Sequence, residues 1–233
     1  MSLFDVYPLY DVTPIKAQDV WVYDAAPTKY LDLYGGHAVI SIGHAHPKYV
    51  ENLTKQLGDI GFYSNAVKNP LQEALGEKLP LQANCPGYQL FMCSSGAEAN
   101  ENALKMASFV TGRKKVVAFH NSFHGRTSAA VAATDNPKIV APINAQQEVE
   151  FLPLGDLDAL AAVLAKGDVC AVIVEFIQGV GGLDISTAEF YEGVDKLCKE
   201  TGTCLIADEV QAGFGRTGNF FAFQEYNVEP ELT

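Results

Sequence analysis

Long apolar runs, basic residues and paired cysteine motifs are all scarce in this chain of 233 residues. No stretch is long and apolar enough to predict a membrane-spanning helix. The first 14 residues also lack the basic start and apolar run of a secretory signal. Only 16 lysines and arginines accompany 28 aspartates and glutamates, so the formal net charge is -12. Such a chain repels phosphate backbones and anionic lipids, so neither nucleic acid nor a membrane is expected as a partner.

Cysteine is present, but not in the patterns that bind metals or build disulfide frameworks. The number of cysteines is odd and no pair has CxxC spacing. Three histidines, His37, His44 and His46, lie close together, but no nearby carboxylate or thiol completes a ligand set, so no metal is expected. We interpret all the cysteines as reduced core thiols of a cytoplasmic protein. They are Cys85, Cys93, Cys170, Cys198 and Cys204.

Short apolar runs alternate with segments of helical periodicity through most of the chain. The predicted strands are 90–93, 115–119, 149–152, 170–174 and 204–207, and the predicted helices include 47–60, 70–79 and 156–164. This alternation predicts parallel βαβ units, and therefore an α/β fold with a mostly parallel sheet and flanking helices. Residues 1–60 are predicted to form a small N-terminal segment, in which 20–23 and 30–33 pair as strands, and 61–233 the large domain.

The apolar run from Cys204 to Ala207 ends abruptly in Asp208 and Glu209. In open α/β sheets the ligand crevice lies at the carboxyl ends of the strands. Asp208 is therefore a candidate partner for a protonated ring nitrogen. The alternative is that both acidic residues face water at the end of an ordinary strand.

A turn of small residues, Ser94–Ala97, separates the predicted strand 90–93 from a helical pattern. Ser94 or Ser95 can cap this helix, and Gly96 lets a ligand approach the backbone. The free N–H groups and the helix dipole favour an anion such as phosphate. The alternative is a capped helix that binds nothing.

Phe123 and Arg126 follow the predicted strand 115–119. Phe123 could stack on a flat ring, and Arg126 could bind a carboxylate with both of its terminal nitrogens. The alternative is a core phenylalanine and a solvated arginine. The chain has only three arginines, so arginine is not its general surface cation.

In their order and spacing these motifs resemble the class III, ornithine-type aminotransferases, which depend on pyridoxal 5'-phosphate and have the fold type I architecture. The resemblance spans almost the whole chain. It implies a homodimer that acts on a small-molecule amino-acid substrate. The matching stretches include Gly43-His44-Ala45-His46-Pro47, Ser95-Gly96-Ala97-Glu98-Ala99-Asn100-Glu101, Phe123-His124-Gly125-Arg126-Thr127, Asp208-Glu209-Val210-Gln211 and Gly215-Arg216-Thr217-Gly218.

The resemblance also implies roles for individual residues around pyridoxal phosphate. Asp208 would pair with the protonated ring nitrogen and keep the ring an electron sink. Phe123 and Val210 would contact the two faces of the ring, and Gln211 would bind its hydroxyl group. The phosphate would be bound at Ser95, Gly96 and Ala97.

The implied reaction moves an amino group between N-acetylornithine or N-succinylornithine and 2-oxoglutarate or glutamate, in arginine biosynthesis. Arg126 would bind a substrate carboxylate, Glu175 would order the polar groups nearby, and His37 would contact the substrate. Val180 stands where the family usually has a second glutamate. Ornithine, 4-aminobutyrate and other ω-amino acids therefore stay open as substrates.

The family's Schiff-base lysine follows the strand that ends at Asp208, whereas the last lysine of this chain is Lys199. We therefore expect this lysine beyond Thr233, a large domain that is incomplete at its C-terminus, and no transamination by the chain alone. Two other functions stay open. One is a non-catalytic module that binds a phosphorylated ligand or a partner chain. The other is a dinucleotide enzyme, based on the weak G-x-G-x-x-G match at Gly213–Gly218.

Overall fold

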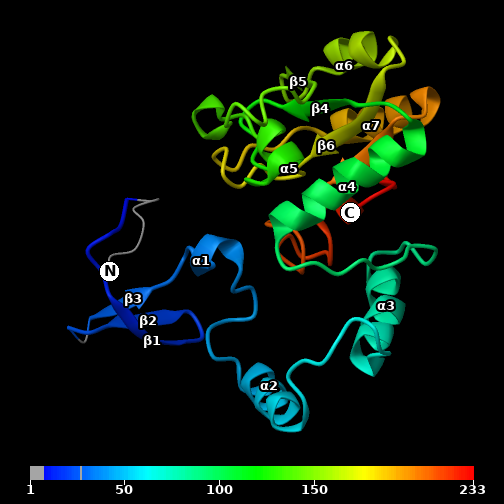
Figure 1. Ribbon diagram of the computed structural model, residues 1–233. Helices are drawn as coiled ribbons and strands as arrows, with labels where there is room; N and C mark the ends of the chain where they lie inside the picture. The colour runs from blue at the N-terminus through cyan, green and yellow to red at the C-terminus, as the bar shows by residue number, and fades with distance from the viewer. Residues whose placement is uncertain (1–7, 27) are drawn as a thin grey trace. The chain divides into compact units, whose positions relative to one another are not determined.

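The computed structural model describes residues 8–26 and 28–233, and the chain divides after Lys68 into two units. The N-terminal unit ends at Lys68 and the large unit begins at Asn69 (Figure 1). The predicted N-terminal segment, 1–60, falls in the first unit, and its residues 1–7 lie outside the described residues. Each unit is described by itself.

A three-stranded antiparallel sheet is the centre of the N-terminal unit. Its strands, in spatial order, are β1 (Pro14–Gln18), β2 (Trp21–Asp24) and β3 (Lys29–Leu31). Val22 pairs with Tyr30, which confirms the predicted pairing of these two segments. β1 was not predicted, because its mostly exposed residues carry no apolar alternation that would indicate a strand.

Asp32 organises the histidine-rich stretch that follows β3. Its Oδ1 accepts hydrogen bonds from the backbone N–H groups of Tyr34 and Gly35, at 2.9 and 2.8 Å. Its Oδ2 lies 2.7 Å from His44 Nε2, and this hydrogen bond lowers the pKa of Asp32. The short helix α1 (Gly35–Ala38) lies within this stretch, and α2 (Pro47–Asp59) follows it as predicted.

Four parallel strands form the sheet of the large unit, in the order β5-β4-β6-β7. They are β4 (Lys115–Phe119), β5 (Val149–Leu152), β6 (Val169–Val174) and β7 (Cys204–Ala207). These strands confirm the predicted parallel α/β class, and only β6 begins one residue earlier than expected. All residues of β6 and β7 are buried, which explains their continuous apolar sequence.

Helices cover both faces of this sheet, so alternate strand residues enter two different cores (Figure 1). The helices of the large unit are α3 (Pro70–Gln82), α4 (Gly96–Thr111), α5 (Ser128–Ala132), α6 (Leu157–Leu164) and α7 (Ala188–Thr201), with short 3-10 turns η1 (Pro137–Ile139) and η2 (Ala222–Glu225). Leu104 of α4 packs with Ile173 and Ile206 on one face. Leu160 of α6 and Val194 of α7 pack with Val172 on the other.

The predicted strand at 90–93 is wrong, because the structure has no strand there. Phe91 and Met92 are 70% and 51% exposed, and Cys93 is an exposed thiol rather than a core one. A strand needs a hydrogen-bonding neighbour, and among the described residues no strand pairs with 90–93. At the outer edge of β7, the Ala207 N–H donates to the Leu232 carbonyl oxygen at 2.9 Å.

α3 continues past Pro80, where its end was predicted. Proline removes one helical hydrogen bond, and this cost is the reason for expecting an end. Here the ring of Pro80 is buried against the unit, and the helix runs on to Gln82. Burial of the ring therefore offsets the lost hydrogen bond.

Arg113 joins the end of α4 to two other elements. Its Nη1 donates to the carbonyl oxygens of Val169, Thr201 and Gly202, at 3.0, 3.1 and 3.2 Å. We expect Arg113→Ala to lower the free energy of unfolding by about 1–3 kcal/mol, because these carbonyls lose a charged donor. Urea unfolding followed by circular dichroism measures this change.

Lys114→Ala is the matched control for that prediction. Lys114 forms an exposed ion pair with Glu148, so its loss should cost less than about 1 kcal/mol. Equal losses in the two variants would contradict the role assigned to Arg113.

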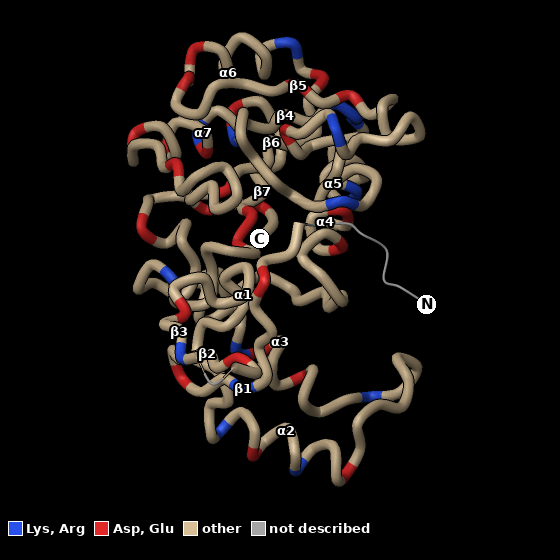
Figure 2. The backbone as a smooth tube through the Cα atoms, turned by 90° about the vertical axis from the view of Figure 1, so that its left-hand side faces the viewer, with Lys and Arg blue, Asp and Glu red and all other residues tan. Residues whose placement is uncertain are grey.

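The acidic residues are spread along both units rather than gathered in one segment (Figure 2). No helix among residues 8–26 and 28–233 has the length and apolarity needed to cross a membrane. A local site for an anion must therefore come from backbone groups or from individual cations within this acidic background.

Candidate active site

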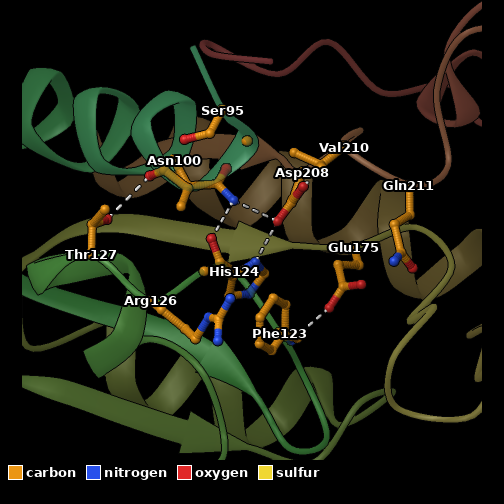
Figure 3. A pocket seen from close by; sticks show the side chains of 13 residues that line it. Ser95, Asn100, Phe123, His124, Arg126, Thr127, Glu175, Asp208, Val210 and Gln211 are labelled. Atoms are coloured by element: carbon orange, nitrogen blue, oxygen red, sulfur yellow. Dashed lines mark hydrogen bonds and ion pairs between the residues drawn. The ribbon is translucent and has the colours of Figure 1, made fainter. Parts of the chain in front are cut away.

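A cavity of about 440 Å³ opens at the carboxyl ends of β4, β6 and β7, beside the start of α4 (Figure 3). It collects every site residue predicted from the sequence except His37. It is lined by Ser95, Gly96, Ala97, Asn100, Phe123, His124, Gly125, Arg126, Thr127, Glu175, Asp208, Val210 and Gln211. This is the position at which open α/β sheets bind their ligands.

The start of α4 presents backbone N–H groups to the cavity. Ser95 is the N-cap, and its Oγ accepts a hydrogen bond from the Glu98 N–H at 3.2 Å. Glu98 Oε2 in turn accepts from the Ser94 N–H at 2.9 Å. The first N–H groups of any helix have no acceptor within the helix, so those of Gly96 and Ala97 suit an anion.

Gly96 is close to the opposite wall of the cavity. A Cβ atom placed on Gly96 would lie only 2.6 Å from Val210 Cγ1. The absence of a side chain at Gly96 therefore lets the start of α4 approach Val210.

Asp208 follows β7 directly and is only 4% exposed, so it does not face bulk water. Its Oδ2 accepts hydrogen bonds from Asn100 Nδ2 at 2.8 Å and from His124 Nδ1 at 2.7 Å. Its Oδ1 accepts from the Val210 N–H at 3.1 Å. These donors fix the orientation of the carboxylate, which is a suitable partner for a cationic N–H group in the cavity.

Asn100 and His124 are pocket residues that sequence reasoning missed. Asn100 Nδ2 also donates to the His124 carbonyl oxygen at 2.8 Å, so one side chain connects α4, β7 and the segment after β4. Both residues are almost completely buried. The available signal was their presence inside the stretches 95–101 and 123–127, but neither residue type by itself indicates a contact with Asp208.

Phe123 and Arg126 lie on one side of the cavity and Val210 on the other (Figure 3). Phe123 is half-buried and Arg126 is exposed, so the proposed stacking surface and cation both remain accessible. A flat ring between Phe123 and Val210 would meet Asp208 at its edge. The arrangement can therefore hold a planar cationic ring and, through Arg126, a carboxylate.

Glu175 and Gln211 complete the cavity wall. Glu175 follows β6, is 5% exposed, and accepts hydrogen bonds from the Phe123 N–H at 2.9 Å and the Gly179 N–H at 3.2 Å. Burial is the largest influence on Glu175 and raises its pKa to about 7, while His124 lowers the pKa and Asp208 raises it. Gln211 lies next to Gly179.

His37 belongs to the N-terminal unit. It lies in α1 with a positive φ of 58°, and its Nδ1 is hydrogen-bonded to the hydroxyl group of Tyr34. These are contacts within its own unit, so its role toward a substrate stays a prediction.

The glycine-rich segment Gly213–Gly218 forms turns, with positive φ at Gly215 and Gly218. The next helical element, η2, is a single 3-10 turn. The dinucleotide fingerprint needs a helix that starts at the glycines, so the geometry argues against that interpretation.

The family model described as aminotransferase class-III matches residues 6–233. The chain belongs to this family. Class-III aminotransferases depend on pyridoxal phosphate, and the chain has their fold type I architecture. The resemblance to this family that the sequence motifs indicated is therefore confirmed.

Two curated relatives are named acetylornithine aminotransferase. The chain is 40% identical to the protein from Bacillus subtilis over 232 residues, which are 99% of this chain and 60% of the relative. It is 41% identical to the protein from Bacillus amyloliquefaciens, covering 97% of this chain and 99% of the relative. The ornithine aminotransferase from Toxoplasma gondii superimposes with a TM-score of 0.91 at 26% identity, over 99% of this chain and 56% of that one. This class-III aminotransferase chain thus spans about 60% of the length of most curated relatives it matches.

The residues of this class-III aminotransferase fit the cofactor of its family. The start of α4 offers N–H groups for a phosphate, and Gly96 allows this helix start to lie close to Val210. Asp208 is a buried carboxylate directed at the cavity between Phe123 and Val210. His124 Nε2 is also buried and has no hydrogen-bond partner among the described residues.

Proposed function

We propose that this chain forms the cofactor pocket of an aminotransferase that acts on N-acetylornithine or N-succinylornithine with 2-oxoglutarate or glutamate. The observation that supports this proposal most is the position of Asp208. Its carboxylate is hydrogen-bonded to Asn100 and His124 in the cavity that is also lined by Arg126 and the start of α4. The names of the relatives at about 40% identity support this substrate class, and with it a place in arginine biosynthesis. The ornithine aminotransferase likeness supports ornithine or another ω-amino acid as the alternative.

Each residue of the pocket would have one task in this reaction. The N–H groups of Gly96 and Ala97 bind the phosphate, and Asp208 keeps a proton on the ring nitrogen. Phe123 and Val210 hold the ring by its two faces. When bound, pyridoxal phosphate supplies an electron sink for the bonds at the substrate's amino-bearing carbon.

Substrate groups would be held by a second set of residues. Arg126 binds a carboxylate, and an arginine fork is specific for that group. Glu175 orders the polar groups nearby and His37 contacts the substrate, whereas Gln211 binds the hydroxyl group of the cofactor ring. We also propose a cytoplasmic homodimer as the working form.

We further propose that the 233-residue chain by itself binds pyridoxal phosphate but does not transaminate. Its last lysine is Lys199, which precedes β7, whereas the family places the Schiff-base lysine after that strand. Lys199 is in α7 and is paired with Asp195 at 2.7 Å.

Two measurements test this function. Titration of the chain with pyridoxal phosphate, followed by absorbance or calorimetry, should show saturable binding at one site. A longer protein that contains this chain together with the Schiff-base lysine should transaminate N-acetylornithine or N-succinylornithine with 2-oxoglutarate faster than ornithine or 4-aminobutyrate. Saturable NAD binding without pyridoxal phosphate binding would instead favour a dinucleotide protein. Turnover by the 233-residue chain would contradict the role given to the Schiff-base lysine.

A further inference from the structure

Glu175 connects two loops that are far apart in sequence. Its Oε1 accepts from the N–H of Phe123, which follows β4, and its Oε2 accepts from the N–H of Gly179, which follows β6. In Figure 3 the carboxylate lies between the Phe123 ring and the Gln211 side chain. Both oxygens of one buried side chain are therefore used on backbone groups.

Gly179 is in turn in close contact with the side chain of Gln211. A Cβ atom on Gly179 would lie 1.8 Å from Gln211 Oε1, so the amide of Gln211 occupies the space where a side chain would be. The loop itself is closed by a hydrogen bond of 2.9 Å from the Leu183 N–H to the Gln178 carbonyl oxygen. Gln178 Nε2 also donates to the His120 carbonyl oxygen at 2.9 Å. These hydrogen bonds fix the loop after β6, against which the Gln211 side chain lies.

We propose that Glu175 is a positioning residue that sets the Phe123 ring and the Gln211 amide at a fixed separation across the pocket. It acts through backbone N–H groups and not by binding substrate. This inference rests on the proposed function only for the identity of the ligand, pyridoxal phosphate. The connection between the two loops stands on the geometry alone.

The charge of Glu175 controls the strength of both hydrogen bonds. Ionised carboxylates accept more strongly than protonated ones. Burial raises the pKa of Glu175 most, His124 after β4 lowers this pKa, and Asp208 after β7 raises it. Its pKa is raised above the ordinary value, so its contribution to fold stability is present at acidic pH and is lost as the pH rises through about 7. Over the same pH range Glu175 becomes ionised. Its hydrogen bonds to the Phe123 and Gly179 N–H groups therefore strengthen, although the buried charge lowers the stability of the fold.

Nuclear magnetic resonance of the full chain, labelled with ¹⁵N at phenylalanine and glycine, tests the connection without any cofactor. The amide signals of Phe123 and Gly179 should shift across neutral pH with one common midpoint, and Glu175→Gln should remove both shifts. Independent midpoints, or shifts that persist in the variant, would overturn the proposal.

Binding of pyridoxal phosphate tests the consequence for the pocket. Glu175→Gln should weaken binding by about tenfold, because an amide offers one oxygen to two donors. Gly179→Ala should weaken binding to a similar degree by displacing Gln211, while the Phe123 amide signal keeps its pH dependence. Gly179 has no positive φ, so its backbone conformation is open to alanine and the expected effect comes from the contact with Gln211.

Glu209→Gln is the matched control. Glu209 is also buried, at 6% exposure, and accepts hydrogen bonds from the Ala222 and Phe223 N–H groups at 2.8 and 2.9 Å, outside the cavity. It should lower stability without a comparable loss of affinity. Unchanged affinity in Glu175→Gln, or equal losses in both variants, would overturn the inference. If the unmodified chain binds no pyridoxal phosphate, the proposed function fails, and the amide titration still decides the role of Glu175.

Discussion

Asp208→Ala is expected to weaken the binding of pyridoxal phosphate by about 10- to 100-fold, as judged from the usual worth of a hydrogen bond to a charged group. In the proposed arrangement the Asp208 carboxylate pairs with the ring nitrogen. The same change leaves the buried donors Asn100 Nδ2 and His124 Nδ1 without their acceptor. We therefore also expect the free energy of unfolding to fall by about 2–4 kcal/mol.

Asp208→Asn separates these two effects. Asparagine keeps an acceptor oxygen and the same shape, so most of the stability should return, while the charge that favours a protonated ring nitrogen is lost. Calorimetric titration with pyridoxal phosphate and urea unfolding measure the two quantities in each variant.

Asp195→Asn is the matched control for Asp208→Asn. Asp195 is a buried carboxylate of α7, 7% exposed and paired with Lys199, and it does not line the cavity. Its replacement should leave the affinity unchanged. Normal affinity in both Asp208 variants would remove the basis for the assigned role.

Gly96→Ala is expected to reduce the affinity for pyridoxal phosphate by about 5- to 150-fold, because overpacking costs about 1–3 kcal/mol. The added Cβ would meet Val210 Cγ1 at 2.6 Å and Cγ2 at 2.7 Å. Either the start of α4 or the Val210 wall must move, and both contact the bound cofactor in our proposal. Affinity measured by titration gives the result.

A second substitution tests this cause directly. Val210→Ala removes both of the clashing methyl groups, so the double variant Gly96→Ala/Val210→Ala should bind more tightly than Gly96→Ala alone. Gly76→Ala is the control, since Gly76 lies in α3 with open space around it and alanine favours a helix by about 1 kcal/mol. A loss of affinity in Gly76→Ala, or no recovery in the double variant, would show that the clash is not the cause.

Local sequence patterns were sufficient for most of the large unit. The apolar runs at 115–119 and 204–207 became β4 and β7, because a buried strand needs apolar residues on both faces, and the run at 149–152 became the half-buried edge strand β5. Asp156 caps α6 through its side chain, which accepts from the Ala159 N–H, so the helix start was visible from the residue type.

Segments whose state depends on a distant partner were not predictable in this way. Residues 90–93 have the composition of a strand, yet among the described residues no strand pairs with them. Composition cannot show whether a segment has a neighbouring strand in the folded chain. For the same reason Cys93 was expected in the core and lies at the surface.

The amino-acid sequence by itself determined the parallel α/β class, the turn at Ser95–Ala97 and the order of polar residues after the strands, because these depend on residues close together in the chain. Only the tertiary structure decided that Asn100 and His124 bind the Asp208 carboxylate and that Glu175 spans two loops. The partners in the first network are 84 and 108 positions apart, and no local periodicity records such a distance. The folding of the sheet brings the carboxyl ends of its strands to one edge, and that approach creates the pocket.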